Sequence, residues 1–153
     1  MIWRWEYFTP EEVLSPVGLA QYLQDNLLMQ PFALDAFDGF RAEFNSPLLV
    51  NHGTLKRRGY RSPEENKKVG GASLSRHTQG IAIDVTAKEF EARVLFEAVL
   101  QSSARYGFGG IGFYPHRNFV HIDCRPILGK GPKVWEELKN GKIISVTDTS
   151  IFH

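Results

Sequence analysis

In the first third of the chain, apolar residues recur at spacings of three and four, which is the period of an α-helix. One such series follows Ser15-Pro16 and predicts a helix over about residues 16–28. A second series follows Pro31 and predicts a helix that ends at about residue 45. Ahead of both, Thr9-Pro10 with a glutamate at the third helical position marks the start of a short helix. The chain therefore opens with three predicted helices.

Strand patterns become frequent from residue 47 onward. Short apolar stretches predict four strands, and the last two are joined by a link short enough for an antiparallel hairpin. The strands are expected at 47–51, 80–85, 110–114 and 118–124, with helices over 62–70 and 88–105 between them. Near the C-terminus we expect a short helix at about 132–139 and a strand at 142–147.

This order of elements favours an α+β fold. Helices come first and strands are then joined by hairpin-like links, so a central antiparallel sheet with helices packed on it is expected. The 153 residues are enough for one hydrophobic core, and we expect a single domain over residues 1–153. The longest apolar stretches are far shorter than the roughly 20 residues that span a bilayer, so no membrane association is expected.

Charge and cysteine content narrow the function further. The formal net charge is +1, so the molecule as a whole has no field that would steer it onto nucleic acid, and we expect no nucleic-acid partner. The basic run at residues 56–58 is interpreted as a solvated face of an exposed loop. Cys124 is the only cysteine, which excludes a cysteine-rich zinc site. A metal would need histidine and carboxylate ligands.

Such ligands occur at two places in the sequence. His77 lies in a glycine-containing loop seven residues before Asp84, which falls on a predicted strand. His121 and Asp123 share one face of another predicted strand, because strand side chains alternate. If the strands of Asp84 and His121 are neighbours, two imidazoles and a carboxylate converge. This is a ligand set that catalytic zinc prefers, with a fourth position left for water, whose pKa zinc lowers to about 7.

Several spaced motifs, in order, resemble the family of zinc D-Ala-D-Ala carboxypeptidases and L-alanyl-D-glutamate endopeptidases. The motifs are Gly59-Tyr-Arg-Ser-Pro-Glu-Glu-Asn66, Val69-Gly-Gly-Ala72, Ser75-Arg-His77 with Gly80, Ala82 and Asp84, Gly110-Ile-Gly-Phe-Tyr-Pro115, and Phe119-Val-His-Ile-Asp123. The resemblance covers about residues 31–126. It implies a hedgehog/DD-peptidase type of fold and cleavage of peptidoglycan stem peptides. It also implies one Zn²⁺ ion with His77, Asp84 and His121 as ligands.

The resemblance assigns substrate contacts as well. Arg61 matches an arginine that lies over the site in the family and is expected to hold the substrate carbonyl or the developing oxyanion, since a fixed guanidinium stabilises negative charge there. A solvated loop cation is the alternative for Arg61. Ser75 is expected either to bind the substrate or ligand loop, or to cap the turn.

The general base departs from the family pattern. Many members carry an acid three residues before the last zinc ligand or a histidine two residues before it, whereas this chain has Asn118 and Phe119 there. Neither takes a proton from water at neutral pH. Asp123 is the first substitute and His116, on the hairpin turn, the second. Asp123 has the alternative roles of orienting a ligand imidazole or of pairing with Arg125.

These observations predict a zinc peptidase that cuts peptidoglycan stem peptides, as a carboxypeptidase or an endopeptidase. The alternative is a catalytically silent zinc-containing binding or structural module, such as a phage virion or tail component. Because the first residues lack the pattern of a signal peptide, we expect the protein to act on the cell wall from a phage virion, or from the host cytoplasm before lysis. Phage structural proteins are therefore candidate partners.

Overall fold

A computed structural model describes residues 3–24, 28–72 and 74–149. Three helices open the chain, as predicted, and each has a proline in its first turn, where the missing N–H group is not needed. They are α1 (Pro10–Val13), α2 (Pro16–Tyr22) and α3 (Pro31–Phe44). The second helix ends earlier than the predicted residue 28, and residues 25–27 of that prediction lie outside the described residues.

The following elements confirm the predicted order up to residue 124. Their bounds are β1 (Leu48–Leu49), α4 (Pro63–Lys68), β2 (Ala82–Ala87), α5 (Ala92–Tyr106), β3 (Gly110–Tyr114), the 3₁₀ turn η1 (Pro115–Arg117) and β4 (Phe119–Asp123). The hairpin of β3 and β4 is antiparallel, as expected from its short link. Ser62 begins α4 with a capping box, in which Ser62 and Glu65 each bind the other's backbone N–H group.

The predicted C-terminal helix at 132–139 is wrong. The segment instead forms β5 (Lys133–Glu137), which pairs with β3, and β6 (Ile143–Ser145) follows as the predicted strand. The two glutamates of this segment suit a helix by intrinsic propensity. Tertiary contacts override that propensity, because Val134 is buried beside Ile111 and the Trp135 indole N–H donates to Tyr114.

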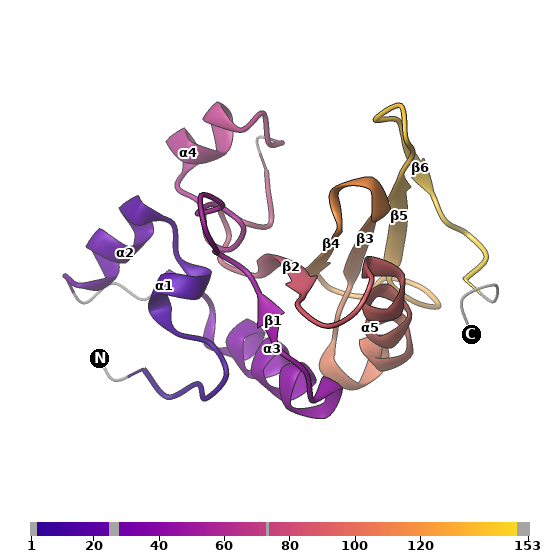
Figure 1. The fold of residues 1–153 in the computed structure, drawn as a ribbon, viewed down its shortest axis with the longest axis horizontal. Helices are drawn as coiled ribbons and strands as arrows, with labels where there is room; N and C mark the ends of the chain where they lie inside the picture. Colours follow the sequence, from indigo (N-terminus) through magenta and orange to yellow (C-terminus); the bar gives the residue numbers. More distant parts are fainter. Residues whose placement is uncertain (1–2, 25–27, 73, 150–153) are drawn as a thin grey trace.

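The described strands form one sheet in the order β1-β2-β4-β3-β5-β6. Neighbouring strands are antiparallel except for β3 and β5, so the α+β prediction is confirmed with a mixed sheet. Figure 1 shows α3 and α5 on one side of the strands, with α4 and its flanking loops next to the end of β2. Among the described residues, no helix has the length and apolar character that crossing a membrane requires.

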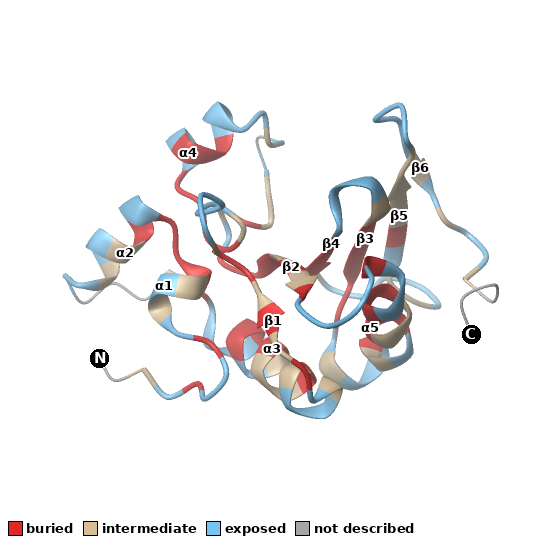
Figure 2. Ribbon diagram, in the orientation of Figure 1, coloured by how far each residue is buried: buried red, intermediate tan, exposed pale blue. Residues whose placement is uncertain are grey.

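The hydrophobic core lies between the sheet and helices α3 and α5, where Figure 2 shows buried positions concentrated. Phe37 and Phe40 of α3 pack on Phe108, and Phe96 of α5 stacks on Phe113. A fully buried phenylalanine contributes about 1.5–3 kcal/mol. In β4 the alternate residues Val120 and Ile122 belong to this core. The other face of the strand is therefore free to carry polar side chains.

The segment of residues 51–72 and 74–77, which is irregular apart from α4, is called the loop arm below. Its start is tied to α1, because the Asn51 amide donates to the carbonyl oxygens of Glu11 and Leu14. Gly59 crosses so close to Val13 that any Cβ would collide with the Val13 carbonyl, which requires glycine there. These contacts fix the loop arm against the helical part of the molecule.

Candidate metal centre and its cationic cleft

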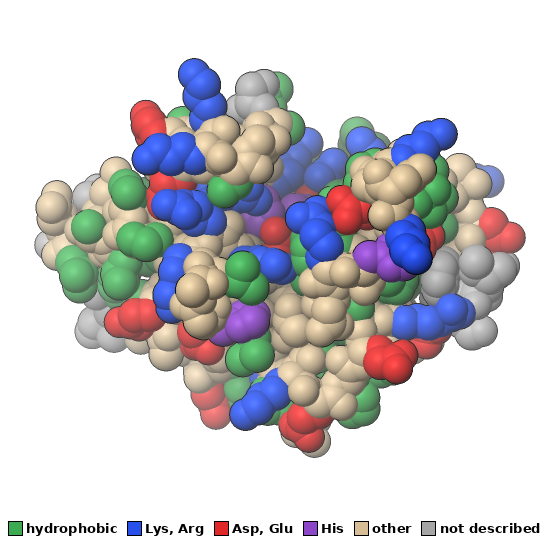
Figure 3. All heavy atoms as spheres, turned by 45° about the horizontal axis from the view of Figure 1, so that its top comes forward, with side chains coloured by type: hydrophobic (Ala, Val, Ile, Leu, Met, Phe, Trp, Pro, Cys, Tyr) green, Lys and Arg blue, Asp and Glu red, His purple; other side chains and the backbone are tan. Residues whose placement is uncertain are grey.

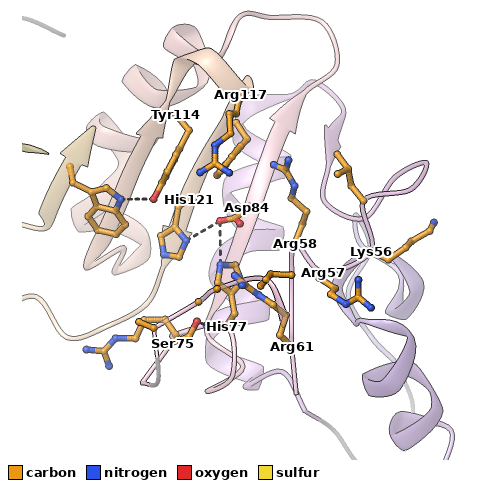
Figure 4. A pocket seen from close by; sticks show the side chains of 18 of the residues that line it. Lys56, Arg57, Arg58, Arg61, Ser75, His77, Asp84, Tyr114, Arg117 and His121 are labelled. Carbon is orange, nitrogen blue, oxygen red and sulfur yellow. Dashed lines mark hydrogen bonds and ion pairs between the residues drawn. The ribbon is translucent and has the colours of Figure 1, made fainter. Parts of the chain in front are cut away.

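Three of the predicted residues come together at the junction of the sheet and the loop arm. Asp84 of β2 stands directly opposite His121 of β4, and His77 comes from the end of the loop arm. Asp84 Oδ1 lies 2.9 Å from His121 Nδ1 and 3.3 Å from His77 Nε2. Figure 4 shows both imidazoles directed at this carboxylate. The three candidate ligand atoms lie within 4.8 Å of one another.

The outer nitrogen of each imidazole is already engaged. His77 Nδ1 lies 2.8 Å from the Gly59 carbonyl oxygen, which only accepts, so Nδ1 carries the proton. His121 Nε2 lies 2.8 Å from Asp123 Oδ2 and donates to that carboxylate. Both rings can therefore present an unprotonated nitrogen to Asp84. A second partner that fixes tautomer and orientation is the usual surrounding of a metal-binding histidine.

The electrostatics of the three residues favour a positive charge between them. Burial lowers the pKa of His77. Burial also acts to lower the pKa of His121, but the hydrogen bonds to Asp123 and Asp84 outweigh it and raise this pKa to about 9. The two imidazoles hold the pKa of Asp84 well below its usual range despite its burial. In the metal-free protein the positive charge is therefore a proton on His121.

The donor set fits a divalent metal ion in place of that proton. Two imidazole nitrogens and one carboxylate oxygen point into the same small space, and a cation there offsets the repulsion between their lone pairs. Nitrogen and oxygen donors of this kind bind zinc, and three protein donors with an open side are typical of catalytic rather than structural centres. The cleft supplies that open side, because all three residues line it.

Arg61 lies next to this centre, and Figure 4 shows it beside His77. The residue is 9% exposed, and Asn66 Oδ1 accepts a hydrogen bond from its Nη1 at 3.2 Å. Asn66 is fixed in turn, because its amide donates to the Ala72 carbonyl. Arg61 is thus a buried, oriented cation and not the solvated loop cation of the alternative interpretation. Ser75 Oγ accepts from the His77 N–H group, as the turn-capping interpretation expects, and Ser75 also lines the cleft.

The two predicted substitutes for the general base lie in different surroundings. Asp123 is fully buried, and both its oxygens are occupied by Arg125 and His121. These contacts hold the pKa of Asp123 well below its usual range, despite burial. His116 is exposed on η1 and is not among the residues that line the cleft. Asn118 is exposed at the end of η1, and Phe119 is buried.

The cleft above the centre has a volume of about 630 Å³ and a strongly positive lining. Among the described lining residues Asp84 is the only carboxylate, whereas seven side chains are lysine or arginine. These cations are Lys56, Arg57, Arg58, Arg61, Arg76, Arg117 and Arg125. In Figure 3 blue side chains surround a hollow in which histidine and acidic side chains are visible. The near-neutral net charge of the chain conceals this local field.

Sequence reasoning missed three lining residues next to the centre. Arg58 was assigned to a solvated basic face, and Tyr114 and Trp135 received no role in the site. The register of β3 and β4 contains the signal for Tyr114, since Gly112 lies opposite His121 and Tyr114 opposite Phe119, two residues along on the same face. No local pattern indicates a role for Trp135, because it lies on β5, a segment that the sequence predicts as a helix.

A three-donor centre with an open side defines a candidate catalytic metal site. Residues 6–123 match the peptidase M15 family, so the chain belongs to that family. This confirms the resemblance found in the sequence and extends it beyond residues 31–126 at the N-terminal end.

Individual relatives are similar over a shorter stretch. Peptidoglycan L,D-endopeptidase MepK of Escherichia coli strain K12 is 38% identical over 73 residues, which are 44% of this chain and 38% of that protein. Probable peptidoglycan L,D-endopeptidase MepK of Haemophilus influenzae is 36% identical over 74 residues, which are 45% of this chain and 38% of that protein. The match thus spans about two fifths of the length of these curated relatives.

Proposed function

We propose that this chain is a zinc-dependent peptidase that cleaves peptidoglycan stem peptides. The observation that carries the proposal is the convergence of His77, Asp84 and His121, with the outer nitrogen of each imidazole already bound. Membership of the peptidase M15 family, which is zinc-dependent in general, supports the metal and the reaction class. The names of the relatives support peptidoglycan as the substrate and favour an endopeptidase over a carboxypeptidase.

His77, Asp84 and His121 would hold the ion. When bound, zinc would supply Lewis-acid polarisation of the scissile carbonyl and a water nucleophile at neutral pH. Arg61, fixed by Asn66, is positioned to bind the substrate carbonyl and to stabilise the charge that develops on its oxygen. Its Nε is buried and has no hydrogen-bond partner among the described residues, so this donor is unsatisfied in the folded chain.

Asp123 is proposed to act through His121. Both its oxygens are engaged and its pKa is lowered, so it is a poor acceptor for a substrate proton but a good partner for the His121 Nε2–H group. This is one of the two roles that were given for Asp123 as alternatives to the base role. The base role that was predicted first for Asp123, and then for His116, stays a prediction, which substitution of each residue tests.

The direct test of the function is digestion of purified peptidoglycan. We expect soluble peptides to be released by the wild-type chain, lost with EDTA and restored by added zinc. Mass spectrometry of the products identifies the bond that is cut. The His77→Ala variant, folded by circular dichroism, is expected to release nothing. Absence of EDTA-sensitive release by zinc-loaded protein would instead indicate the silent binding or structural module.

The place of action is a further part of the proposal. Action on the cell wall agrees with the substrate of the relatives. The origin of the chain in a phage virion or in the host cytoplasm before lysis, and its association with phage structural proteins, stay predictions. Detection of the chain in purified virions by mass spectrometry would test them.

A further inference from the structure

Arg58 is held beside the candidate centre by its backbone. Its N–H group donates to Asn51 Oδ1 at 3.1 Å, and its carbonyl oxygen accepts from the Asp84 N–H group at 2.6 Å. The first bond ties Arg58 to the anchored start of the loop arm. The second ties it to β2 at the residue that faces both imidazoles. Arg58 is therefore built into the wall of the centre, in contrast to the freely solvated cation expected from the basic run.

Burial lowers the pKa of the half-buried Arg58 guanidinium, and the nearby charge of Asp84 offsets this in part without a direct ion pair. Arg58 Cζ lies 4.2 Å from the centre of the Phe119 ring, which itself stacks on Tyr114. Nη1 of Arg58 is buried and has no hydrogen-bond partner among the described residues, and no described carboxylate lies within ion-pair distance of the side chain. A desolvated cation without a partner is unfavourable, so an anion that reaches it would be bound strongly.

Arg117 approaches the same aromatic ring from the opposite wall. Its Cζ lies 5.1 Å from the centre of Phe119. Nε and Nη2 of Arg117 bind the two oxygens of Glu137, which fixes the side chain. Arg58 and Arg117 are close enough to repel each other. Figure 4 shows both on one side of Asp84, whereas Arg61 lies on the other side, next to His77.

We propose that Arg58 and Arg117 form a carboxylate-binding subsite beside the candidate metal centre. This inference rests on the proposed peptidase function and adds the substrate class, namely peptides with a free carboxylate close to the bond that is cut. A carboxylate in this place accepts donors from the fork of Arg58 and is attracted by Arg117, whose Nε and Nη2 stay on Glu137, whereas the neutral carboxamide offsets no charge. Stem peptides whose acidic residues are amidated should therefore be poor substrates.

The test compares one synthetic stem tetrapeptide with free carboxylates and the same peptide with these groups as carboxamides. Wild-type protein is expected to bind the free acid about tenfold or more tightly by isothermal titration, after EDTA treatment, because a desolvated charge pair contributes more than about 1.4 kcal/mol. In Arg58→Gln the preference should fall to within about twofold. With zinc, the loss should appear in KM more than in kcat, since the carboxylate is bound equally in ground and transition states.

Three further variants make the result specific. Arg58→Lys keeps the charge without the fork and should keep part of the preference. Arg117→Gln changes a largely exposed residue, so it should fold even if Arg58→Gln does not, and it should also reduce the preference. Arg93→Gln removes a cation from α5, outside the cleft, and should keep the full preference.

Failure of the subsite and failure of the function give different outcomes. Equal binding of the two peptides by wild type, or a preference that persists in both Arg58→Gln and Arg117→Gln, overturns the subsite. If the binding preference depends on Arg58 but no zinc-dependent cleavage occurs, the subsite stands and the peptidase function fails. If cleavage occurs without a carboxylate preference, the function stands and the subsite fails.

Discussion

The two walls of the cleft hold the side chains of the candidate site by different means. On the sheet, Asp84 and His121 are set by the register of two paired strands, and Asp123 follows His121 on the same face. On the loop arm, Arg58, His77 and Arg61 stand on irregular backbone. Individual hydrogen bonds from Asn51, Gly59 and Asn66 hold that backbone and those side chains.

Because of this difference, residues on the two walls should respond differently to substitution. A strand residue shares a ladder of hydrogen bonds with its neighbours, so its position resists single substitutions. A loop residue depends on one or two bonds, so its position is easily altered while the core is preserved. We therefore expect Asp84 and His121, the two candidate ligands on the sheet, to keep their positions when residues around them change, whereas the third, His77, depends on the loop arm. The loop arm should determine which substrates are bound.

The largest effect is expected from Asp84→Asn on the sheet. The amide removes the negative charge that draws a cation between the imidazoles, so EDTA-sensitive peptide release should fall to background. The fold should survive, since the β2–β4 ladder uses backbone groups. Glu97→Gln on α5 is the control for a lost carboxylate and should retain full activity. Substantial release by folded Asp84→Asn would show that the carboxylate is not needed.

The next effect concerns the pH dependence of the metal-free protein. His121 has a pKa of about 9 in the folded chain against 6.5 in the unfolded chain, so its stabilisation is complete below pH 6.5 and is lost as pH rises through 9. The free energy of unfolding should fall by an amount on the order of 3 kcal/mol between these values. Urea denaturation of EDTA-treated protein at several pH values measures this. His121→Gln should remove the fall, and an unchanged slope would exclude His121 as its source.

Asp123→Asn distinguishes an orienting carboxylate from a general base. If Asp123 orients His121, zinc affinity should fall by about 10–100-fold, the usual effect of losing a partner of a ligand imidazole. If Asp123 is the base, kcat should fall with unchanged zinc affinity. His116→Gln is the matched variant, because it should leave zinc affinity unchanged and lower kcat only if His116 is the base. Competition with a zinc chelator measures the affinity of each variant.

The smallest effect is expected at the anchor of the loop arm. Asn51→Ala removes the bonds to Glu11 of α1 and to its C-cap Leu14, together with the bond that holds the Arg58 backbone. It should lower the free energy of unfolding by about 1–2 kcal/mol. The carboxylate preference of the cleft should also weaken. Asn140→Ala removes one exposed side-chain bond to Lys142 and should change stability by less than about 0.5 kcal/mol. Equal losses in the two variants would contradict the anchoring role of Asn51.

Much of the site was predictable from local pattern. Side chains alternate along a strand, so His121 and Asp123 could be assigned to one face from the sequence alone. Their meeting with Asp84 required only that β2 and β4 be neighbours, which they are. Prolines and capping residues also predicted where helices start, because a cap acts within one helical turn and is therefore visible in the local sequence.

The parts that were missed depend on contacts distant in sequence. The β5 segment has helix-favouring glutamates, and only its pairing with β3 makes it a strand. Arg58 belongs to a run of three cations that is usually solvated, and only its contacts with Phe119 and the Asp84 backbone bring it into the cleft. The orienting contact of Asp123 was foreseen as an alternative, but the choice required the positions of Arg125 and His121.

The most direct measurement is the zinc content of the purified chain after zinc loading and dialysis, determined by mass spectrometry of the metal. We predict one equivalent in the wild type and in His116→Gln, and none in His77→Ala or His121→Ala. Wild-type protein that retains no zinc, or folded histidine variants that keep a full equivalent, would contradict a metal centre built from these three side chains.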